Sequence, residues 1–405
     1  MKPDFSAINI DDYTYPLTED RIAKFPLEQR DASKLLVYDG HTTCSGQFRN
    51  IPSYLPENSF LVLNNTRVVR ARLFFRKPTG ALIEVFCLEP VLPTPEIQQA
   101  FQVRSHAVWK CLVGNARRWK EGPLQVRFSH QEQEVVLTAE KLEKSGDAWL
   151  LQFSWQPADL AFAEVLESYG RIPLPPYLNR EAVEEDKQRY QTVYAFHDGS
   201  VAAPTAGLHF TEKVFEKLEQ KNIHVGYITL HVGAGTFKPV GGEGIEKHEM
   251  HTEQVLIEKE LVEKLQENAG KVIAVGTTTV RTLESLYWYG VKLQDDPDAG
   301  FSVHQFDPYL IPQDEQPDMK ESLANVLAYM QRKNLGYLPG TTQLMIVPGY
   351  RYRMIRGMVT NFHQPRSTLL LLIAAWLGDK WKDIYVYALK NDFRFLSYGD
   401  SCLFL

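Results

Sequence analysis

The sequence predicts an α/β protein in which a layered α/β domain, residues 1–66 and 157–405, carries an inserted antiparallel β-barrel domain, residues 67–156. Short β-branched and aromatic runs separated by Gly or Pro turns recur in the insert, a pattern typical of a small barrel or sandwich. After Pro157, apolar strands alternate with amphipathic helices, which indicates a layered α/β domain. A chain of 405 residues is long enough for two or three domains.

The first strong signal along the chain is an apolar run at residues 60–63, which is bounded by Asn64 and Asn65 and predicts a buried strand. The strands of the insert follow, with little helical periodicity between them. The predicted strands of the insert are residues 72–75, 82–88, 108–113, 124–128, 134–137 and 149–153.

Helical periodicity begins after Pro157. An amphipathic helix is predicted over residues 158–169 and ends at Gly170, because the proline-rich residues that follow cannot continue it. Residues 291–340 are acidic and contain several prolines, and they are interpreted as a surface excursion. The other predicted helices are residues 211–221, 261–269, 279–289 and 367–377, and the other strands are residues 225–232, 272–275 and 354–359.

Composition excludes several classes of protein. Hydrophobic residues make up 44% and charged residues 23% of the chain, which is typical of globular proteins and not of collagen, long coiled coils or disordered chains. The longest apolar run, residues 369–376, is far shorter than the ~20 residues that span a bilayer, and no secretory signal is recognisable, so we expect a soluble, cytoplasmic protein. The four cysteines form no CxxC pair, so neither a zinc site nor a disulfide framework is predicted.

Charge is unevenly distributed along the chain. Between residues 66 and 122, ten Lys and Arg stand against four Asp and Glu, a local excess of +6 in a chain whose net charge is −6. Such asymmetry is compatible with a basic face for a polyanion. Solvated surface charge without a partner is equally consistent with the sequence.

Glycines and threonines follow two of the predicted strands. Gly276-Thr277-Thr278-Thr279 leads from a strand into a helix, and free backbone N–H groups at a helix N-terminus suit a carboxylate, a phosphate or ribose hydroxyls. Plain N-capping by threonine explains the same residues. Gly233 and Gly235 also follow a strand, but no helix opens at once, so the dinucleotide fingerprint fails.

Histidines provide the candidate proton-transfer groups. His209 and His363 each stand on a loop before a helix, where α/β folds place their ligands, although structural loop histidines are about as common. His248 and His251 are three residues apart, but the spacing does not fit a usual metal-ligand set, so no metal is predicted.

Ten segments of the chain together resemble one known family and occur in the order found there. They are residues 30–33, 63–67, 169–177, 189–194, 200–210, 231–237, 248–251, 276–285, 361–368 and 397–400. The family they resemble is the S-adenosylmethionine:tRNA ribosyltransferase-isomerase (QueA) family of queuosine biosynthesis. The resemblance implies an α/β domain with an inserted β-barrel. It also implies transfer and isomerisation of the ribosyl group of S-adenosylmethionine onto 7-aminomethyl-7-deazaguanine in a tRNA anticodon, without a metal.

The chemistry of such a reaction and the local basic charge, rather than the resemblance itself, suggest roles for individual residues. His209 or His231 would act as base or acid, and Asp31 would orient a cation or hydroxyls. The co-substrate S-adenosylmethionine would contact Thr205, Gly207, Gly233, Gly235, Gly276, Thr277, Thr278 and Thr279, and the anticodon arm of the tRNA would contact Arg117, Arg118, Lys120 and Arg366.

Two alternatives remain at this point. A tRNA-binding paralogue that is non-catalytic or has an altered substrate would have the same segments. A methyltransferase using the same co-substrate is less favoured, because no strand–GxGxG–helix unit is present. The sequence does not give the oligomeric state.

Overall fold

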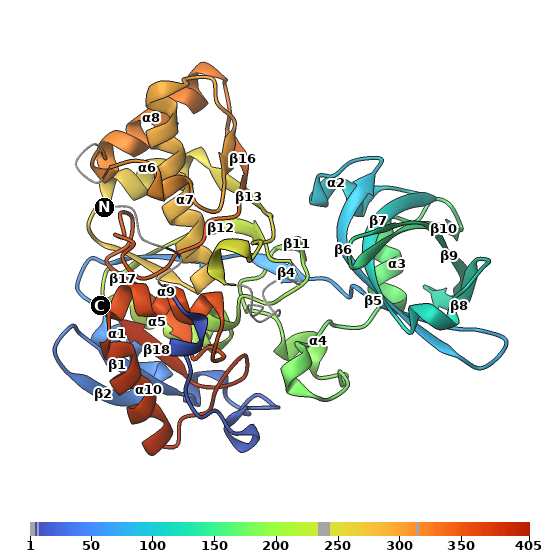
Figure 1. The fold of residues 1–405 in the computed structure, drawn as a ribbon, viewed down its shortest axis with the longest axis horizontal. Helices are drawn as coiled ribbons and strands as arrows, with labels where there is room; N and C mark the ends of the chain where they lie inside the picture. The colour runs from blue at the N-terminus through green and yellow to red at the C-terminus, as the bar shows by residue number, and fades with distance from the viewer. Residues whose placement is uncertain (1–4, 6–7, 234–243, 313–315) are drawn as a thin grey trace.

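The computed structural model describes residues 5, 8–233, 244–312 and 316–405, and Figure 1 shows a large α/β body beside a smaller β body. The large body is built on a mixed sheet of ten strands. From edge to edge these are β15 (Phe301–Val303), β16 (Tyr337–Thr342), β13 (Glu253–Glu258), β12 (His224–His231), β3 (Phe60–Asn64), β14 (Val272–Val275), β17 (Gly357–Asn361), β18 (Ser401–Phe404), β1 (Lys34–Tyr38) and β2 (Thr43–Gln47).

The centre of this sheet is parallel, since β12, β3, β14 and β17 are neighbours that run in one direction. The carboxyl ends of these strands therefore lie at one edge of the sheet, where α/β folds bind ligands. The C-terminal strand β18 pairs with β17 on one side and with β1 on the other. The two ends of the chain are thereby joined in one sheet.

Both faces of the central strands are covered, because their apolar residues alternate between two cores. On β3, Leu61 and Leu63 face α1 (Ile51–Tyr54) and α5 (Glu212–Gln220), whereas Phe60 and Val62 belong to the larger core on the other side. The helices of that larger core are α6 (Lys259–Glu267), α7 (Thr277–Asp295), α8 (Met319–Arg332), α9 (Thr368–Leu377) and α10 (Lys380–Lys390). This arrangement is the predicted layered α/β fold.

Residues 291–340 are not a surface excursion, and that expectation is wrong. They complete α7 and supply β15, α8 and most of β16, which extends the large sheet through its pairing with β13. Leu323, Val326 and Met330 lie on one side of α8 and are fully buried. Pro297, Pro308, Pro312 and Pro317 lie between these elements. Asp295, Glu321 and Pro339 lie within them and are exposed, so neither residue type excludes a packed layer.

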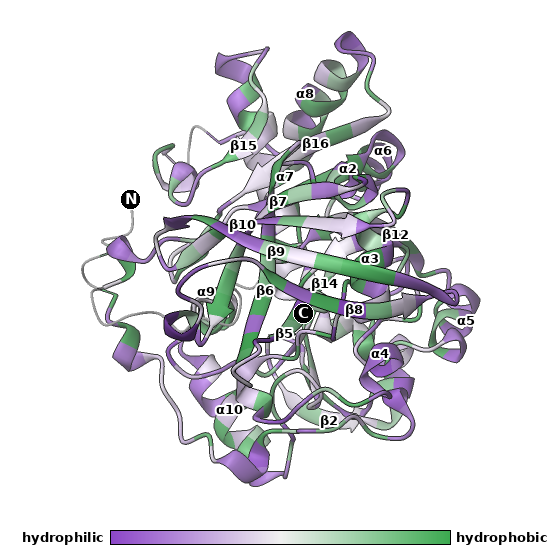
Figure 2. Ribbon diagram, turned by 90° about the vertical axis from the view of Figure 1, so that its right-hand side faces the viewer, coloured by the Kyte–Doolittle hydropathy of each residue, from purple (hydrophilic) through white to green (hydrophobic). Residues whose placement is uncertain are grey.

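The smaller body is a six-stranded antiparallel sheet whose edge strands contact each other, so that it forms a near-barrel. All six predicted strands are present, and the flanking helices are α2 (Ile97–Gln102) and α3 (Phe162–Tyr169). Figure 2 shows this sheet in front of the large one. In spatial order its strands are β5 (Arg72–Arg76), β6 (Leu82–Leu92), β7 (His106–Gly114), β10 (Ala148–Gln156), β9 (Gln133–Ser145) and β8 (Leu124–His130).

The two connections between the bodies run side by side. β4 (Thr66–Val68) pairs with β11 (His197–Ser200), and Arg72 forms a β-bridge with Arg171.

Helix α3 begins at Phe162 rather than at 158, because the Glu164 carboxylate accepts a hydrogen bond from the Ala161 N–H and so defines the start of the helix. No helix in the described part of the chain is long and apolar enough to cross a membrane.

Candidate active site

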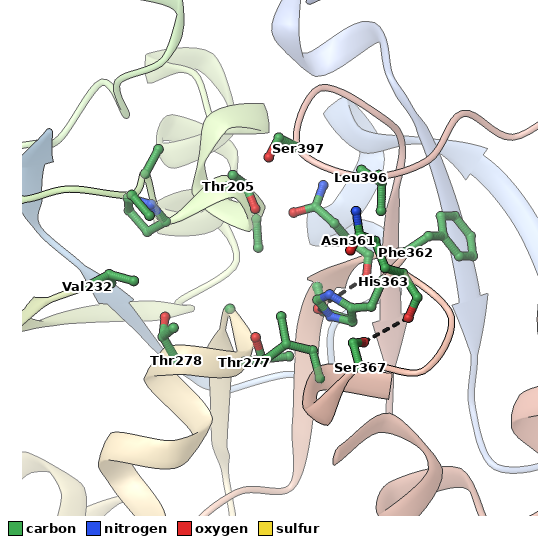
Figure 3. A pocket seen from close by; sticks show the side chains of 18 of the residues that line it. Thr205, Val232, Thr277, Thr278, Asn361, Phe362, His363, Ser367, Leu396 and Ser397 are labelled. Atoms are coloured by element: carbon green, nitrogen blue, oxygen red, sulfur yellow. Dashed lines mark hydrogen bonds between the residues drawn. The ribbon is translucent and has the colours of Figure 1, made fainter. Parts of the chain in front are cut away.

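A pocket opens where three parallel strands end. Val232 follows β12, Gly276 follows β14, and Asn361 is the last residue of β17. Two loops, residues 202–206 and 396–397, close the other side, and Figure 3 shows the side chains meeting from these segments. The lining residues are Tyr177, Tyr190, Ala202, Ala203, Pro204, Thr205, Ala206, Val232, Gly276, Thr277, Thr278, Thr360, Asn361, Phe362, His363, Gln364, Ser367, Leu369, Leu396 and Ser397.

The first turn of α7 lies at this pocket. Gly276 is the N-cap and has φ +97°, a conformation that suits glycine, while its N–H donates to the Val359 carbonyl of β17. Thr277 and Thr278 line the pocket. Because the first N–H groups of a helix lack intrahelical acceptors, this end of the pocket favours an anionic or hydroxyl-bearing ligand group.

No formally charged side chain lines the pocket among the residues described. Its one histidine, His363, has Nε2 2.9 Å from Thr360 Oγ1, and burial lowers the pKa of His363 to about 3, so the ring is neutral. Tyr177 and Ser397 hydroxyls are 2.6 Å apart. The Tyr190 hydroxyl is buried and has no hydrogen-bond partner in the described ranges. The pocket therefore offers neutral hydrogen-bonding groups on an aromatic and aliphatic wall.

Asn361 connects the pocket to a buried network behind it. Its Nδ2 lies 3.2 Å from His209 Nε2, and His209 Nδ1 lies 2.8 Å from Ser33 Oγ. The His209 ring packs on Phe48 with centroids 5.1 Å apart. Burial, aided by the charges of Arg394 and Arg30, lowers the pKa of His209 to about 4, so this imidazole is neutral at pH 7. His209 therefore lies behind the pocket wall and contacts the pocket through Asn361.

A larger cleft of about 580 Å³ lies between the near-barrel and the large sheet and shares Val232 with the pocket. Its barrel side includes Phe86, Leu88 and Lys110, and its other side includes His231. Burial, followed by the nearby His197, lowers the pKa of His231 to about 4. His231 Nδ1 has no hydrogen-bond partner within the described segments. The cleft is large enough for a nucleobase or a similar planar group.

Gly199 is required for the position of the His231 ring. A Cβ at Gly199 would lie 2.3 Å from His231 Nδ1, and the residue has φ +144°. A larger residue there would displace the imidazole. The ring is thus held against the backbone of β11, beside the connection between the two bodies.

The structure brings some of the predicted co-substrate residues together. Thr205, Gly276, Thr277 and Thr278 line the pocket, and Gly233 lines the adjoining cleft. Gly235 lies outside the described residues.

Three other predicted residues face elsewhere. Thr279 is fully buried and its hydroxyl donates to the Val275 carbonyl at 2.8 Å. Gly207 is packed against Tyr194, whose hydroxyl a Cβ would approach to 1.9 Å. Asp31 accepts a hydrogen bond from Thr211 Oγ1 at 3.0 Å, at the start of α5.

The predicted tRNA-binding side chains are exposed. Arg117, Arg118 and Lys120 lie on or next to a 3₁₀ turn, Ala116–Arg118, that connects β7 to β8. Arg366 is exposed beside the pocket loop, and its Nη1 lies 3.4 Å from Asp11 Oδ1. None of these four residues is held in the protein core, so all are accessible to a partner.

Sequence reasoning missed the pocket residues Asn361, Tyr177, Tyr190 and Ser397 as ligand groups. All four lie inside segments that carried the family resemblance, and Asn361 ends an apolar strand, a position that could have identified it. No group of three or more His, Cys, Asp or Glu that could hold a metal is found in the described part of the chain.

The fold and a pocket at the carboxyl ends of its parallel strands are those of the α/β proteins that bind small molecules at this edge of the sheet. The family profile described as "Queuosine biosynthesis protein" matches residues 10–404. An S-adenosylmethionine:tRNA ribosyltransferase-isomerase from Trichlorobacter lovleyi is 36% identical over 97% of this chain and 99% of its own. The protein of the same name from Halothermothrix orenii is 36% identical over 98% and 100%.

A solved structure also matches the full length. It is the crystal structure of S-adenosylmethionine tRNA ribosyltransferase from Thermotoga maritima, with 28% identity, a TM-score of 0.45, and coverage of 97% of this chain and 100% of that one. On the profile and the two full-length relatives, the chain belongs to the S-adenosylmethionine:tRNA ribosyltransferase-isomerase family.

Proposed function

We propose that this protein transfers the ribosyl group of S-adenosylmethionine to 7-aminomethyl-7-deazaguanine in a tRNA anticodon and isomerises it. The product is epoxyqueuosine-tRNA, and adenine and methionine are released. The observation that carries this proposal is the family match over residues 10–404, at 36% identity to relatives that are covered almost completely. The neutral pocket and the adjoining cleft are consistent with two substrates that meet between them.

S-adenosylmethionine occupies the pocket in this proposal. Thr277, Thr278 and the N–H groups of the first turn of α7 receive an anionic or hydroxyl-bearing group of the co-substrate, and Thr205 lies in the facing loop. Bound there, the positive sulfonium makes the adjacent C5′ hydrogens acidic, so a base of modest pKa can start the reaction. A pocket without a formal cation avoids repulsion of the sulfonium.

The base must be unprotonated and must face the reacting groups. His231 meets both conditions in this proposal, because its pKa of about 4 keeps the ring neutral and it lines the cleft next to Val232. The flipped deazaguanine occupies that cleft, between the near-barrel and the large sheet. His209 and Asp31 remain predicted participants. His209 lies behind the pocket wall and contacts Asn361, whereas Asp31 lies at the start of α5.

The remaining assignments concern the tRNA. The chain divides into an α/β catalytic domain, predicted as residues 1–66 and 157–405, and an inserted domain, predicted as residues 67–156. Helix α3 packs in the core of the near-barrel, so it belongs with the inserted domain. The inserted domain presents Arg117, Arg118 and Lys120 to the phosphates of the anticodon arm. Arg366, beside the pocket loop, contacts the same arm. Exposure of all four side chains supports this assignment.

One incubation tests the function. The protein is mixed with S-adenosylmethionine and tRNA that carries the deazaguanine precursor, and the nucleosides and small molecules are analysed by mass spectrometry. Epoxyqueuosine with adenine and methionine is the expected result. S-adenosylhomocysteine would instead indicate methylation, and tRNA binding without consumption of S-adenosylmethionine would indicate a non-catalytic paralogue.

A further inference from the structure

The Asn361 side chain has one polar atom that the protein leaves unused. Asn361 is 3% exposed, and its Oδ1 has no hydrogen-bond partner in the described ranges. Buried amide oxygens nearly always accept a hydrogen bond, because leaving one unpaired costs free energy. Asn361 lines the pocket and reaches from the end of β17 toward Thr205 (Figure 3). An unpartnered acceptor in a pocket indicates a donor on the ligand.

The orientation of this amide is fixed from behind. Nδ2 lies 3.2 Å from His209 Nε2 and 3.5 Å from the Asp400 carbonyl oxygen. An amide oxygen in that place would face a carbonyl oxygen, so the nitrogen belongs there. His209 Nε2 must then accept, and its ring proton is on Nδ1, which donates to Ser33 Oγ at 2.8 Å. Burial keeps the imidazole neutral and so preserves this pattern.

We propose that Ser33 and His209 are positioning residues that hold the Asn361 oxygen as a fixed acceptor for an N–H donor of the co-substrate. This inference rests on the proposed function, since it takes S-adenosylmethionine as the occupant of the pocket. A ligand hydroxyl can both donate and accept, and it would pair with either orientation of the amide. A fixed orientation is selective only for a group that donates and cannot accept, as an N–H group does.

S-adenosylmethionine carries two such groups, the 6-amino group of adenine and the α-ammonium of methionine. They share the donor chemistry and differ in charge. A neutral hydrogen bond contributes about a factor of 5 in affinity, and one to a charged donor about a factor of 10 to 100. Two results together therefore identify the group that donates to Asn361 Oδ1: which analogue loses affinity, and how large that loss is.

Binding without tRNA provides the test. The dissociation constants of S-adenosylmethionine and two analogues are measured calorimetrically for the wild type and for Asn361→Leu. One analogue has hydrogen in place of the 6-amino group, and the other has hydrogen in place of the α-ammonium. We expect one analogue to bind the wild type about 5- to 100-fold more weakly than S-adenosylmethionine does; this ratio is the analogue discrimination. Asn361→Leu should bind S-adenosylmethionine and that analogue about equally.

Variants of His209 separate positioning from proton transfer. His209→Leu removes the acceptor and frees the amide to turn, so we expect it to lose most of the analogue discrimination. His209→Gln offers a carbonyl oxygen to Asn361 Nδ2, so we expect it to keep part of that discrimination. If His209 instead transfers protons, both substitutions should lower kcat and leave the analogue discrimination as large as in the wild type.

The controls cover folding and the proposed function itself. Asn268→Leu makes the same change at the end of α6, away from the pocket, and should keep wild-type discrimination. If Asn361→Leu does not fold, Asn361→Ala replaces it. Unchanged discrimination in a folded Asn361 variant overturns this inference alone. If the wild type binds S-adenosylmethionine only with tRNA present, the same constants are measured with tRNA added. A wild type that forms no epoxyqueuosine in the incubation described above overturns the proposed function and this inference with it.

Discussion

His209 and His231 are both buried and neutral, but their surroundings differ. Both ring nitrogens of His209 lie within hydrogen-bond distance of protein groups, Ser33 and Asn361. His231 lines the cleft, and its Nδ1 has no partner in the part of the chain that the structure describes. A group that transfers a proton to substrate needs a nitrogen that protein groups leave unpaired, so His231 stays the predicted proton-transfer group, with its Nδ1 packed against Gly199.

His231→Gln should lower kcat by about 10²-fold, the usual effect of removing a general acid or base. The affinity for S-adenosylmethionine without tRNA should stay the same, because His231 lines the cleft and not the pocket. Single-turnover kinetics and calorimetry measure the two quantities. His197→Gln, beside His231, is the matched control and should retain turnover. Wild-type turnover in His231→Gln would move the role to His209 or Asp31.

Burial of His209 also makes stability depend on pH. Its pKa is about 4 in the folded protein, below the ~6.5 of an unfolded chain, so the unfolded state binds more protons between these values. Stability is therefore lost as pH falls from about 6.5 towards 4. His209→Gln should remove about 2 kcal/mol of the loss in unfolding free energy between pH 7 and 5. Urea unfolding at both pH values measures it, with exposed His41→Gln as the unchanged control.

At the scale of elements, helix α7 joins the pocket to the core. Its first turn carries Thr277 and Thr278 at the pocket, and Thr279 in the same turn faces the protein interior. Two turns further on, Glu284 is fully buried against the loop before β17. One helix therefore contributes both to the pocket and to the packing behind it.

Thr278→Val should weaken S-adenosylmethionine binding by about 5-fold, the contribution of one neutral hydrogen bond, without loss of stability. The two side chains have nearly the same shape, so the helix is preserved. Thr279→Val is the matched control in the same turn: it removes the bond to the Val275 carbonyl and should lower the melting temperature but not the affinity. Equal affinities for Thr278→Val and the wild type would place this end of the pocket outside the co-substrate site.

Glu284 holds the loop at residues 350–354. Its carboxylate accepts from the Arg353 N–H at 2.9 Å, the Met354 N–H at 3.0 Å and the Tyr350 hydroxyl at 2.9 Å. Glu284→Leu leaves these three donors buried without an acceptor, so the unfolding free energy should fall by about 3 to 5 kcal/mol. Glu284→Gln keeps an acceptor oxygen and should lose less. Equal losses in both variants would show that the hydrogen bonds contribute little.

The same carboxyl group has a pH signature. Burial raises the pKa of Glu284 to about 7 despite its donors, above the ~4.3 of an unfolded chain. The folded state then retains a proton that the unfolded state has released, so this contribution to stability is lost as pH rises through 7. Urea unfolding measures this effect. Between pH 5 and 8, the unfolding free energy of Glu284→Gln should rise relative to that of the wild type by about 3 kcal/mol.

The strand Val272–Val275 could be predicted from sequence to the residue, because an apolar run bounded by Lys271 and Gly276 is a local signal. The layer formed by α8 was missed, although Leu323, Val326 and Met330 already show helical spacing. The orientation of Asn361 could not have been predicted. It depends on His209, Ser33 and Asp400, which come from distant parts of the chain and meet only in the folded protein.

At the scale of the whole molecule, the near-barrel places its basic turn far from helix α10 (Figure 1). Replacing Arg117, Arg118 and Lys120 by Gln should weaken tRNA binding and reduce the slope of log affinity against log salt by about two to three units. Filter binding at several salt concentrations measures this. Binding of S-adenosylmethionine alone should not change.

A matched triple variant separates local contact from net charge. Lys380, Lys382 and Lys390 on α10 are equally exposed, and their replacement by Gln removes the same charge. This control should keep the wild-type salt slope. An unchanged slope in the near-barrel variant would mean that its three cations only solubilise the surface.

The place of β18 in the large sheet has a consequence for biosynthesis. Residues 35–38 of β1 pair with residues 401–404 of β18, and β18 in turn joins them to β17. On the ribosome, β1 and β2 are made early but have no route into the main sheet until β18 emerges. Through most of translation this hairpin exposes an apolar, unpaired edge, the kind of surface that chaperones bind and that promotes aggregation.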